Sequence, residues 1–317
     1  MNNQKSSIEI RVIAPSQSWN GQKFIRNYER AQERLENMGY RVTFAKNIKN
    51  VLHFGTASSQ DRADDFNAAY RDKNIKLVMT LTGGWSSNEI LPLIDWQIVK
   101  DNPKPLIGFS DITVLLNAIY ARTGNVGYLG PNFATIGRML QWQYTLENFN
   151  AAINKLPIQL MQSKYWGEHG TKQRKTKPWK TLQTGTAKAV LIGGNLGSLY
   201  LLQGTPYMPT FNNPFIFLLE DDDEAGAYTA KEVSRRLESL LQLPHFKENL
   251  RGLIVGRFPK SSRVLEKDIV SILSSKKLAN IPIVYNIDFG HTLPMLTLPI
   301  GRSLEIIAAE RVTMALK

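Results

Sequence analysis

The sequence predicts an α/β fold in which roughly the first 150 residues form a parallel, doubly wound sheet. Short apolar runs of strand length alternate with segments whose apolar residues recur at helical spacing. Glycine-containing turns follow several of these runs, where a strand passes into the next helix. Ligands bind at the carboxyl ends of the strands in such sheets, so the residues after each run are candidates for a functional site.

The expected elements alternate along both halves of the chain. In the first half we expect strands at 8–14, 41–45, 75–81 and 105–109, and helices at 24–38, 58–71, 89–99 and from 112 onward. In the second half we expect strands at 187–192, 214–219, 250–255 and 281–285, and helices ending at 202 and covering 230–241. Residues 164–185 are polar and basic without a periodic pattern, which predicts a linker or long loop. A glycine- and proline-rich segment from Phe289 closes the chain. We therefore expect an N-terminal domain at 1–155, a linker or substrate loop at 156–185 and a C-terminal domain at 186–317.

Composition excludes several classes of protein. The 317 residues contain no cysteine, which rules out disulfides, a cysteine nucleophile and thiolate metal sites. The net charge of +12 would suit nucleic acid or phosphorylated ligands, but the basic residues are mostly scattered and form no nucleic-acid-binding motif. The N-terminus has no apolar signal-peptide core, and glycines and prolines interrupt the longest uncharged run, 189–219. We expect a cytoplasmic protein with neither nucleic acid nor membrane as a partner.

Ser110 stands where the expected strand at 105–109 turns into the next helix. A tight strand–turn–helix of this kind lifts a serine hydroxyl out of the sheet as a nucleophile, and the backbone N–H of the next residue, Asp111, then points at the developing oxyanion. The second glycine of the G-x-S-x-G pattern is missing, since Ile112 takes its place. The alternative is that Ser110 or Asp111 only caps the helix.

A glycine turn, Gly83-Gly84-Trp85-Ser86-Ser87, follows the buried run at 75–81. It lacks the lysine and the spacing of phosphate-binding loops. Its amides can supply a second oxyanion donor close to Ser110. The alternative is an ordinary turn between a strand and a helix.

Two further residues complete a possible hydrolase site. Glu220 ends an apolar strand, and His291 follows a glycine after another. The order Ser110, Glu220, His291 is the nucleophile–acid–base order of hydrolases built on parallel sheets. A lone histidine is more often structural, and the acidic run after Glu220 can instead be a solvated turn or a cation site, although it lacks EF-hand spacing. The four histidines form no zinc motif, so we expect no metal.

Trp166 and Trp179 lie in the basic segment at 164–185. A tryptophan beside cations can stack on a nucleobase while the cations hold a phosphate. The alternative is that both only pack the loop down.

Taken together, a set of motifs resembles the LD-carboxypeptidase family of serine peptidases, which includes the microcin C immunity proteins. The motifs are Ala14-Pro15-Ser16, Gly83-Gly84-Trp85-Ser86-Ser87-Asn88, Gly108-Phe109-Ser110-Asp111, Gly130-Pro131, Gly193-Gly194-Asn195-Leu196, Gly204-Thr205-Pro206-Tyr207-Met208-Pro209, Leu219-Glu220-Asp221 and Phe289-Gly290-His291. The resemblance implies a Rossmann-like N-terminal domain, a smaller, swivelling, β-rich C-terminal domain, and a cytoplasmic homodimer without metal or cofactor. It also implies a Ser110–His291–Glu220 triad, with the amides of Asp111 and Gly84 as the oxyanion hole.

The resemblance leaves two branches open. One trims the terminal D-alanine from murein tetrapeptides, and the other cleaves the amide between a peptide or aspartate and an adenylate-like group. The form Gly83-Gly84-Trp85-Ser86 favours the second branch and implies substrate binding by Gly83, Trp85 and Ser86. Trp166 is the expected nucleobase-stacking residue, with Trp179 not excluded. The segment 221–233 is longer than in many relatives, which can bring Glu224 nearer the site. A catalytically inactive binding protein on the same fold is a third possibility, which the presence of all three triad residues disfavours.

Overall fold

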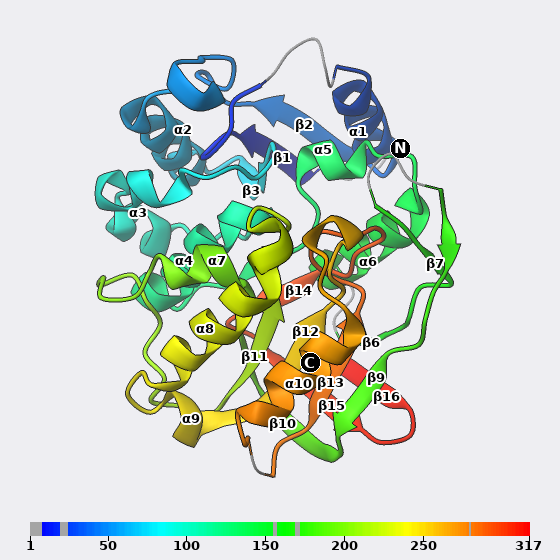
Figure 1. Cartoon of the computed structure of the whole chain (residues 1–317). Coiled ribbons are helices and arrows are strands. Elements are labelled where there is room, and N and C mark those ends of the chain that lie inside the picture. The colour runs from blue at the N-terminus through cyan, green and yellow to red at the C-terminus, as the bar shows by residue number, and fades with distance from the viewer. Residues whose placement is uncertain (1–7, 20–24, 155–156, 169–171, 279) are drawn as a thin grey trace.

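A computed structural model of the chain describes residues 8–19, 25–154, 157–168, 172–278 and 280–317. The expected domain boundary at 155–156, the first residue of the helix expected at 24–38, and His169 fall outside these ranges. The described residues form an α/β fold around one large, mostly parallel sheet, as the sequence predicts. Figure 1 shows the first half of the chain, blue to cyan, in the upper part of the view and the yellow-to-red second half below it.

The first half is a parallel sheet in the order β2-β1-β3-β4-β5. Its strands are β1 (Ile8–Ile13), β2 (Tyr40–Phe44), β3 (Ile75–Thr80), β4 (Leu106–Gly108) and β5 (Gly127–Leu129). Its helices are α1 (Ile25–Asn37), α2 (Ser59–Arg71), α3 (Trp96–Asp101), α4 (Thr113–Thr123), α5 (Phe133–Ile136) and α6 (Trp142–Asn154). This is a doubly wound order of the kind whose ligands sit at the carboxyl ends of the strands.

The single helix expected at 89–99 is wrong. The chain instead forms a 3₁₀ helix at Ser87–Leu93, which contains Pro92, and then begins α3 at Trp96. The proline has no N–H to continue an α-helix, and the Asp95 side chain accepts a hydrogen bond from Ile98 N at 3.0 Å, capping a new helix.

The second half continues the same sheet. The strands β10 (Gly185–Asn195), β11 (Phe215–Glu220), β12 (Leu250–Gly256) and β13 (Ile283–Ile287) run parallel, and β9 (Lys180–Gln183) pairs antiparallel with β13. Its helices are α7 (Leu196–Tyr200), α8 (Thr229–Leu241), α9 (Phe246–Asn249) and α10 (Glu266–Ser275). The halves join through β14 (Leu298–Ile300), which pairs antiparallel with β5 and parallel with β10.

The sequence did not predict β5, and two further regions contain unpredicted strands. The closing segment forms β14, β15 (Ser303–Ala308) and β16 (Val312–Leu316), and β15 lies along β10. The segment expected to be a linker or loop contains the two-stranded hairpin of β7 (Tyr165–Trp166) and β8 (Arg174–Lys175), and also β9. Just before it, β6 (Ile158–Leu160) pairs with β16. Apart from β7 and β8, which pair with each other, these strands belong to the large sheet and join strands distant in sequence, which a local pattern does not reveal.

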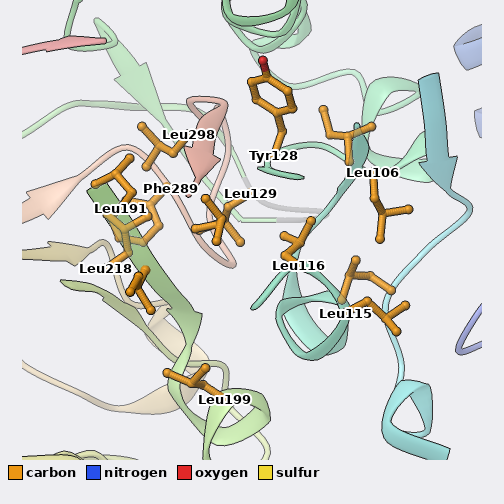
Figure 2. Close-up of a cluster of buried hydrophobic side chains, with 14 of the residues drawn as sticks. Leu106, Leu115, Leu116, Tyr128, Leu129, Leu191, Leu199, Leu218, Phe289 and Leu298 are labelled. Carbon is orange, nitrogen blue, oxygen red and sulfur yellow. The ribbon is translucent and has the colours of Figure 1, made fainter. Parts of the chain in front are cut away.

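One hydrophobic core spans both halves and fixes the position of the site. Figure 2 shows the junction, where Leu129 of β5 lies between side chains of the first half, such as Leu116, and side chains of the second half, such as Leu191 and Phe289. All four side chains are at most 2% exposed. Shared burial of this kind disfavours independent movement of the strand ends that meet at the junction. In the described part of the chain, no helix is both long and apolar enough to cross a membrane.

Candidate active site

Ser110 occupies a sharp turn between β4 and α4. Its φ is +64°, in the left-handed region that a residue with a Cβ rarely adopts. The turn is possible because Gly108 ends the strand without a side chain: a Cβ there would lie 2.3 Å from Thr80 Oγ1 and 2.9 Å from Ile112 Cγ2. Strain of about 1–3 kcal/mol at such a residue persists only where the surrounding structure imposes it, and it is common at functional sites.

The fold brings Glu220 and His291 to this turn from two distant segments. Glu220 is the last residue of β11 and is fully buried, while His291 follows β13 in the loop toward β14. Nδ1 of His291 lies 2.7 Å from Glu220 Oε2, and Nε2 lies 2.9 Å from Ser110 Oγ. The ring of Phe109 packs edge-on against the imidazole, with centroids 5.3 Å apart. In this arrangement a histidine can take the proton of a serine hydroxyl while a carboxylate holds its other nitrogen.

The electrostatics of the site favour a charged imidazole. Burial lowers the pKa of His291, but the Glu220 carboxylate, aided by Asp222 and Asp221, outweighs it and raises that pKa to about 9. Burial, and then Asp222 and Glu220, raise the pKa of Asp221 to about 7, against the opposing effect of Arg236. The resting site therefore carries a protonated histidine at neutral pH.

The glycine turn at 83–87 passes directly against the nucleophile. A Cβ on Gly83 would lie 2.9 Å from Ser110 Cβ, and one on Gly84 would lie 2.2 Å from Ser16 Oγ. Only glycine permits this approach. Gly84 and Asp111 both line the cavity onto which Ser110 opens, which is where amide donors to a developing oxyanion are needed.

Buried polar side chains hold this turn in place. The Asp111 carboxylate is 2% exposed and accepts hydrogen bonds from Ser16 Oγ at 2.6 Å and Ser87 N at 2.8 Å. Arg62 is equally buried, donates to Ser86 O at 2.8 Å and Ser86 Oγ at 3.1 Å, and pairs with Glu89. No sequence motif surrounds Arg62, which lies within α2, so its role is visible only in the folded protein.

A cavity of about 280 Å³ opens at Ser110 between the two halves of the chain. The first half contributes Gly84, Trp85 and Asp111, and the second half contributes Asn195, acidic residues that follow β11, and Arg236 of α8. Asn195 is 1% exposed, and its side chain caps α7 by accepting hydrogen bonds from Ser198 N at 2.9 Å and Ser198 Oγ at 2.8 Å. The Gly193-Gly194-Asn195 motif is recognisable in the sequence, but the position of Asn195 in the cavity is visible only in the structure.

Three of the residues expected to bind substrate belong to the glycine turn, and the structure places them differently. Trp85 lines this cavity, is 59% exposed, and donates its indole N–H to Glu224. Gly83 packs on the nucleophile, as described above. Ser86 does not line the cavity and instead turns its oxygens to Arg62.

Trp166 lies in a second cavity of about 400 Å³. The guanidinium groups of Arg257 and Arg174 lie 5.2 and 5.8 Å from its ring centroid. Trp179 does not line either cavity: it is 7% exposed, and its indole N–H donates to Asp288 at 2.9 Å. Of the two tryptophans, only Trp166 is therefore placed to meet a ligand.

Gly256, which lines the second cavity, packs directly against Glu220. A Cβ on Gly256 would lie 2.9 Å from Glu220 Cβ and 2.7 Å from Phe289 O. In addition, Gly167 and Leu293 exchange backbone hydrogen bonds of 2.8 Å, which ties the strand of Trp166 to the loop after His291. Among the residues that the structure describes, no group of three or more His, Asp or Glu side chains is arranged to hold a metal ion.

Comparisons with known proteins agree with this architecture. Residues 10–130 match the profile of the LD-carboxypeptidase N-terminal domain, and residues 188–306 match that of the LD-carboxypeptidase C-terminal domain. The protein named "Putative carboxypeptidase YocD" of Bacillus subtilis (strain 168) is 36% identical over 315 residues, covering 96% of this chain and 94% of that protein. The microcin C7 self-immunity protein MccF of Escherichia coli is 29% identical over 300 residues, covering 87% of this chain and 84% of that protein.

A solved structure agrees over nearly the whole chain. The crystal structure of an MccF-like protein from Bacillus anthracis superimposes with a TM-score of 0.94 at 35% identity, covering 98% of this chain and 96% of that one. The two-domain architecture of this chain therefore matches that of MccF-like proteins. The chain is a peptidase and belongs to the LD-carboxypeptidase family of serine peptidases, together with the MccF-like proteins.

Proposed function

We propose that Ser110, His291 and Glu220 form a catalytic triad that hydrolyses an amide bond in a small peptide-type substrate. The observation that carries this proposal is the continuous chain of contacts from Glu220 Oε2 through His291 to Ser110 Oγ, with distances of 2.7 and 2.9 Å, at the opening of a cavity. The strained φ of Ser110 supports it, because a serine that only capped a helix would not need a left-handed backbone.

The residues support a two-step mechanism. Once His291 is neutral, Nε2 takes the proton of Ser110 as Oγ attacks the carbonyl carbon, and Glu220 stabilises the imidazolium. The amides of Asp111 and Gly84 donate to the oxyanion; loss of one such donor typically costs about 100- to 1,000-fold in rate. His291 then gives its proton to the leaving nitrogen. A water attacks the acyl-enzyme with His291 again as base, and Ser110 is regenerated.

We propose a substrate of the microcin C immunity type, a peptidyl or aminoacyl adenylate analogue, in which Ser110 attacks the acyl carbonyl. The second cavity supports this choice, because Trp166 and several cations in one pocket suit a nucleobase and a phosphate-like group. A mutant of the microcin C7 self-immunity protein MccF, with a tryptophan replaced by phenylalanine, has been solved in complex with adenosine monophosphate. The other candidate is release of D-alanine from a murein tetrapeptide, which the description of the family as LD-carboxypeptidases favours.

A paired assay on the purified protein separates these candidates. We expect hydrolysis of an aminoacyl sulfamoyl-adenosine and none of a murein tetrapeptide that ends in D-alanine. Release of D-alanine alone would replace the proposed substrate with the murein one. The Ser110→Ala variant should fold and lose activity. Hydrolysis retained in that variant would overturn the triad, and no turnover of either substrate would favour the inactive binding protein.

The assembly and location remain proposals. We propose a cytoplasmic homodimer with domains at 1–155 and 186–317 and a substrate loop at 156–185. The matches of residues 10–130 and 188–306 to two separate domain profiles support this division. Sedimentation equilibrium should give twice the mass of the chain. Binding to duplex DNA at physiological salt should be absent; tight, salt-sensitive binding would contradict the expectation that nucleic acid is not a partner.

A further inference from the structure

The cavity at Ser110 has an acidic wall made of three residues. Asp221, Asp222 and Glu224 follow β11 directly, and all three line the cavity. They lie at its side toward the second half of the chain, one to four residues after Glu220. An acyl group attacked by Ser110 would occupy this space, because the nucleophile lines this cavity.

One cation lines the same cavity among the described residues, and its charge is already matched. The guanidinium of Arg236 lies 3.3 Å from Asp221 Oδ2 through Nη1 and 3.4 Å from Glu232 Oε2 through Nε. Arg236 thus offsets Asp221 and an acid outside the cavity. Among the described residues no lysine or arginine pairs with Asp222 or Glu224, and the protonated His291, which acts on both, is itself paired with Glu220.

The hydrogen bonds to Asp222 and Glu224 come from neutral donors. Asp222 Oδ2 accepts from Asn195 Nδ2 at 3.3 Å, and Asp222 Oδ1 accepts from the backbone N–H of Glu224 at 2.9 Å. Glu224 accepts from the indole N–H of Trp85. Neutral donors orient these carboxylates but do not cancel their charge, so the cavity has a negative potential at the place where an acyl group would sit.

The charged residues that line the second cavity are mostly basic. Its lining includes Arg174, Lys175, Lys177, Arg257 and Lys260, against the single acid Glu266, and of these cations Arg257 is already paired with the buried Asp288 at 2.7 Å. Glu266 is in turn paired with Lys180 and lies 3.9 Å from Lys177 Nζ. Ser110 lines the first cavity, and Gly256, which packs against Glu220, lines the second. The acidic cavity at the nucleophile suits a cationic group, whereas the basic second cavity suits an anionic one.

We propose that the cavity at Ser110 is the acyl-side subsite and that it selects an acyl residue carrying an ammonium group, held by Asp222 and Glu224. The inference rests on the proposed function, because it assigns the acyl half of that substrate to this cavity. A carboxylate side chain in the same place would face two like charges in a partly desolvated space, which disfavours acidic acyl residues. The ammonium can be that of a basic side chain or the α-amino group, and the test distinguishes these two sources.

The test compares sulfamoyl-adenosine substrates that differ only in the acyl residue. Lysyl and norleucyl forms have nearly the same shape, so their ratio of kcat/KM reports the side-chain charge. We expect the lysyl form to exceed the norleucyl form at least about tenfold and the glutamyl form at least about a hundredfold. If the α-amino group is the cation, lysyl and norleucyl forms will be equal, and acetylation of the norleucyl amine will lower kcat/KM at least about tenfold. Equal values for the lysyl, norleucyl, glutamyl and acetylated forms would overturn the proposal.

Substitutions locate the selecting charges. Glu224→Gln and Asp222→Asn should each reduce, at least about threefold, the kcat/KM ratio that reports the ammonium group. That is the lysyl-to-norleucyl ratio or, if the α-amino group is the cation, the ratio of free-amine to acetylated norleucyl form. Asp223→Asn is the matched control: it removes the same charge between these two residues in sequence, but Asp223 does not line the cavity. An unchanged ratio in the first two variants, or an equal reduction in the control, would refute the assignment to this wall.

A binding measurement separates failure of the inference from failure of the proposed function. Ser110→Ala protein titrated with the lysyl and norleucyl forms should bind the lysyl form at least about tenfold more tightly, or bind the free-amine norleucyl form more tightly than its acetylated form. If native protein turns over none of these substrates, the proposed function fails, while the titration still decides whether the cavity selects an ammonium group. If all are turned over and bound equally, the function stands and this inference falls.

Discussion

Replacing Glu220 with glutamine removes a charge from His291 and nearly preserves the shape of the side chain. The carboxylate lies 2.7 Å from Nδ1 and is the main reason that the pKa of His291 is about 9 and not the usual 6.5, despite the burial that lowers it. At about 1.4 kcal/mol per pKa unit, the difference corresponds to about 3 kcal/mol of stabilisation of the imidazolium. The imidazolium forms as Ser110 attacks, so the same energy is available to the transition state.

The expected loss of activity depends on pH, because the carboxylate also keeps the resting histidine protonated. In native protein, kcat/KM should rise about tenfold per pH unit through neutrality and level off near the His291 pKa of about 9. In Glu220→Gln it should level off by about pH 6.5, at a plateau about 300-fold below that of the native protein. The ratio of native to variant activity should therefore be small near pH 6.5 and grow steadily to about pH 9.

The assay is the pH profile of aminoacyl sulfamoyl-adenosine hydrolysis, with thermal unfolding to show that the variant is folded. Glu248→Gln is the matched control, since that side chain is 75% exposed and pairs with His245. It should keep the native profile. A ratio that does not change with pH, or a native profile already flat at pH 7, would refute this account of His291.

Three further results are expected. Gly290→Ala should abolish hydrolysis, because its Cβ would lie 2.6 Å from Glu220 Oε2, whereas Gly39→Ala, with a similar positive φ and no atom within 4 Å, should lose only about 1 kcal/mol of stability and keep activity. In denaturant unfolding, Ser110→Gly should be more stable than Ser110→Ala by about 1 kcal/mol, because glycine relieves the φ of +64°; equal stabilities would contradict the strain. The raised pKa of His291 stabilises the folded protein fully below pH 6.5, so the free energy of unfolding should lose that contribution, up to about 3 kcal/mol, as pH rises to about 9, and Glu220→Gln should show a smaller fall.

Local sequence patterns were enough to predict the elements whose residues interact with near neighbours in the chain. Apolar runs and helical spacing located β1 to β4, β10 to β13 and most of the long helices, because burial on one face leaves a periodic pattern. The turn at Ser110 was also readable, since a strand, a glycine and a helix start are adjacent there. The prediction of one helix at 89–99 was wrong because Pro92 interrupts the α-helix, although the apolar residues around it keep helical spacing.

Features that depend on residues far apart in sequence, such as strand partners and the charge of a cavity, are visible only in the folded protein. The pairing of β14 with both β5 and β10 joins the two halves, and no local pattern specifies such a partner. The same holds for charge. In the sequence, the acidic run after Glu220 is equally consistent with a solvated turn. It lines a cavity only because the fold places it and Ser110 around the same space. Side-chain periodicity is a local property of the chain, whereas distances between segments and the potential inside a cavity arise from the packing of the whole chain.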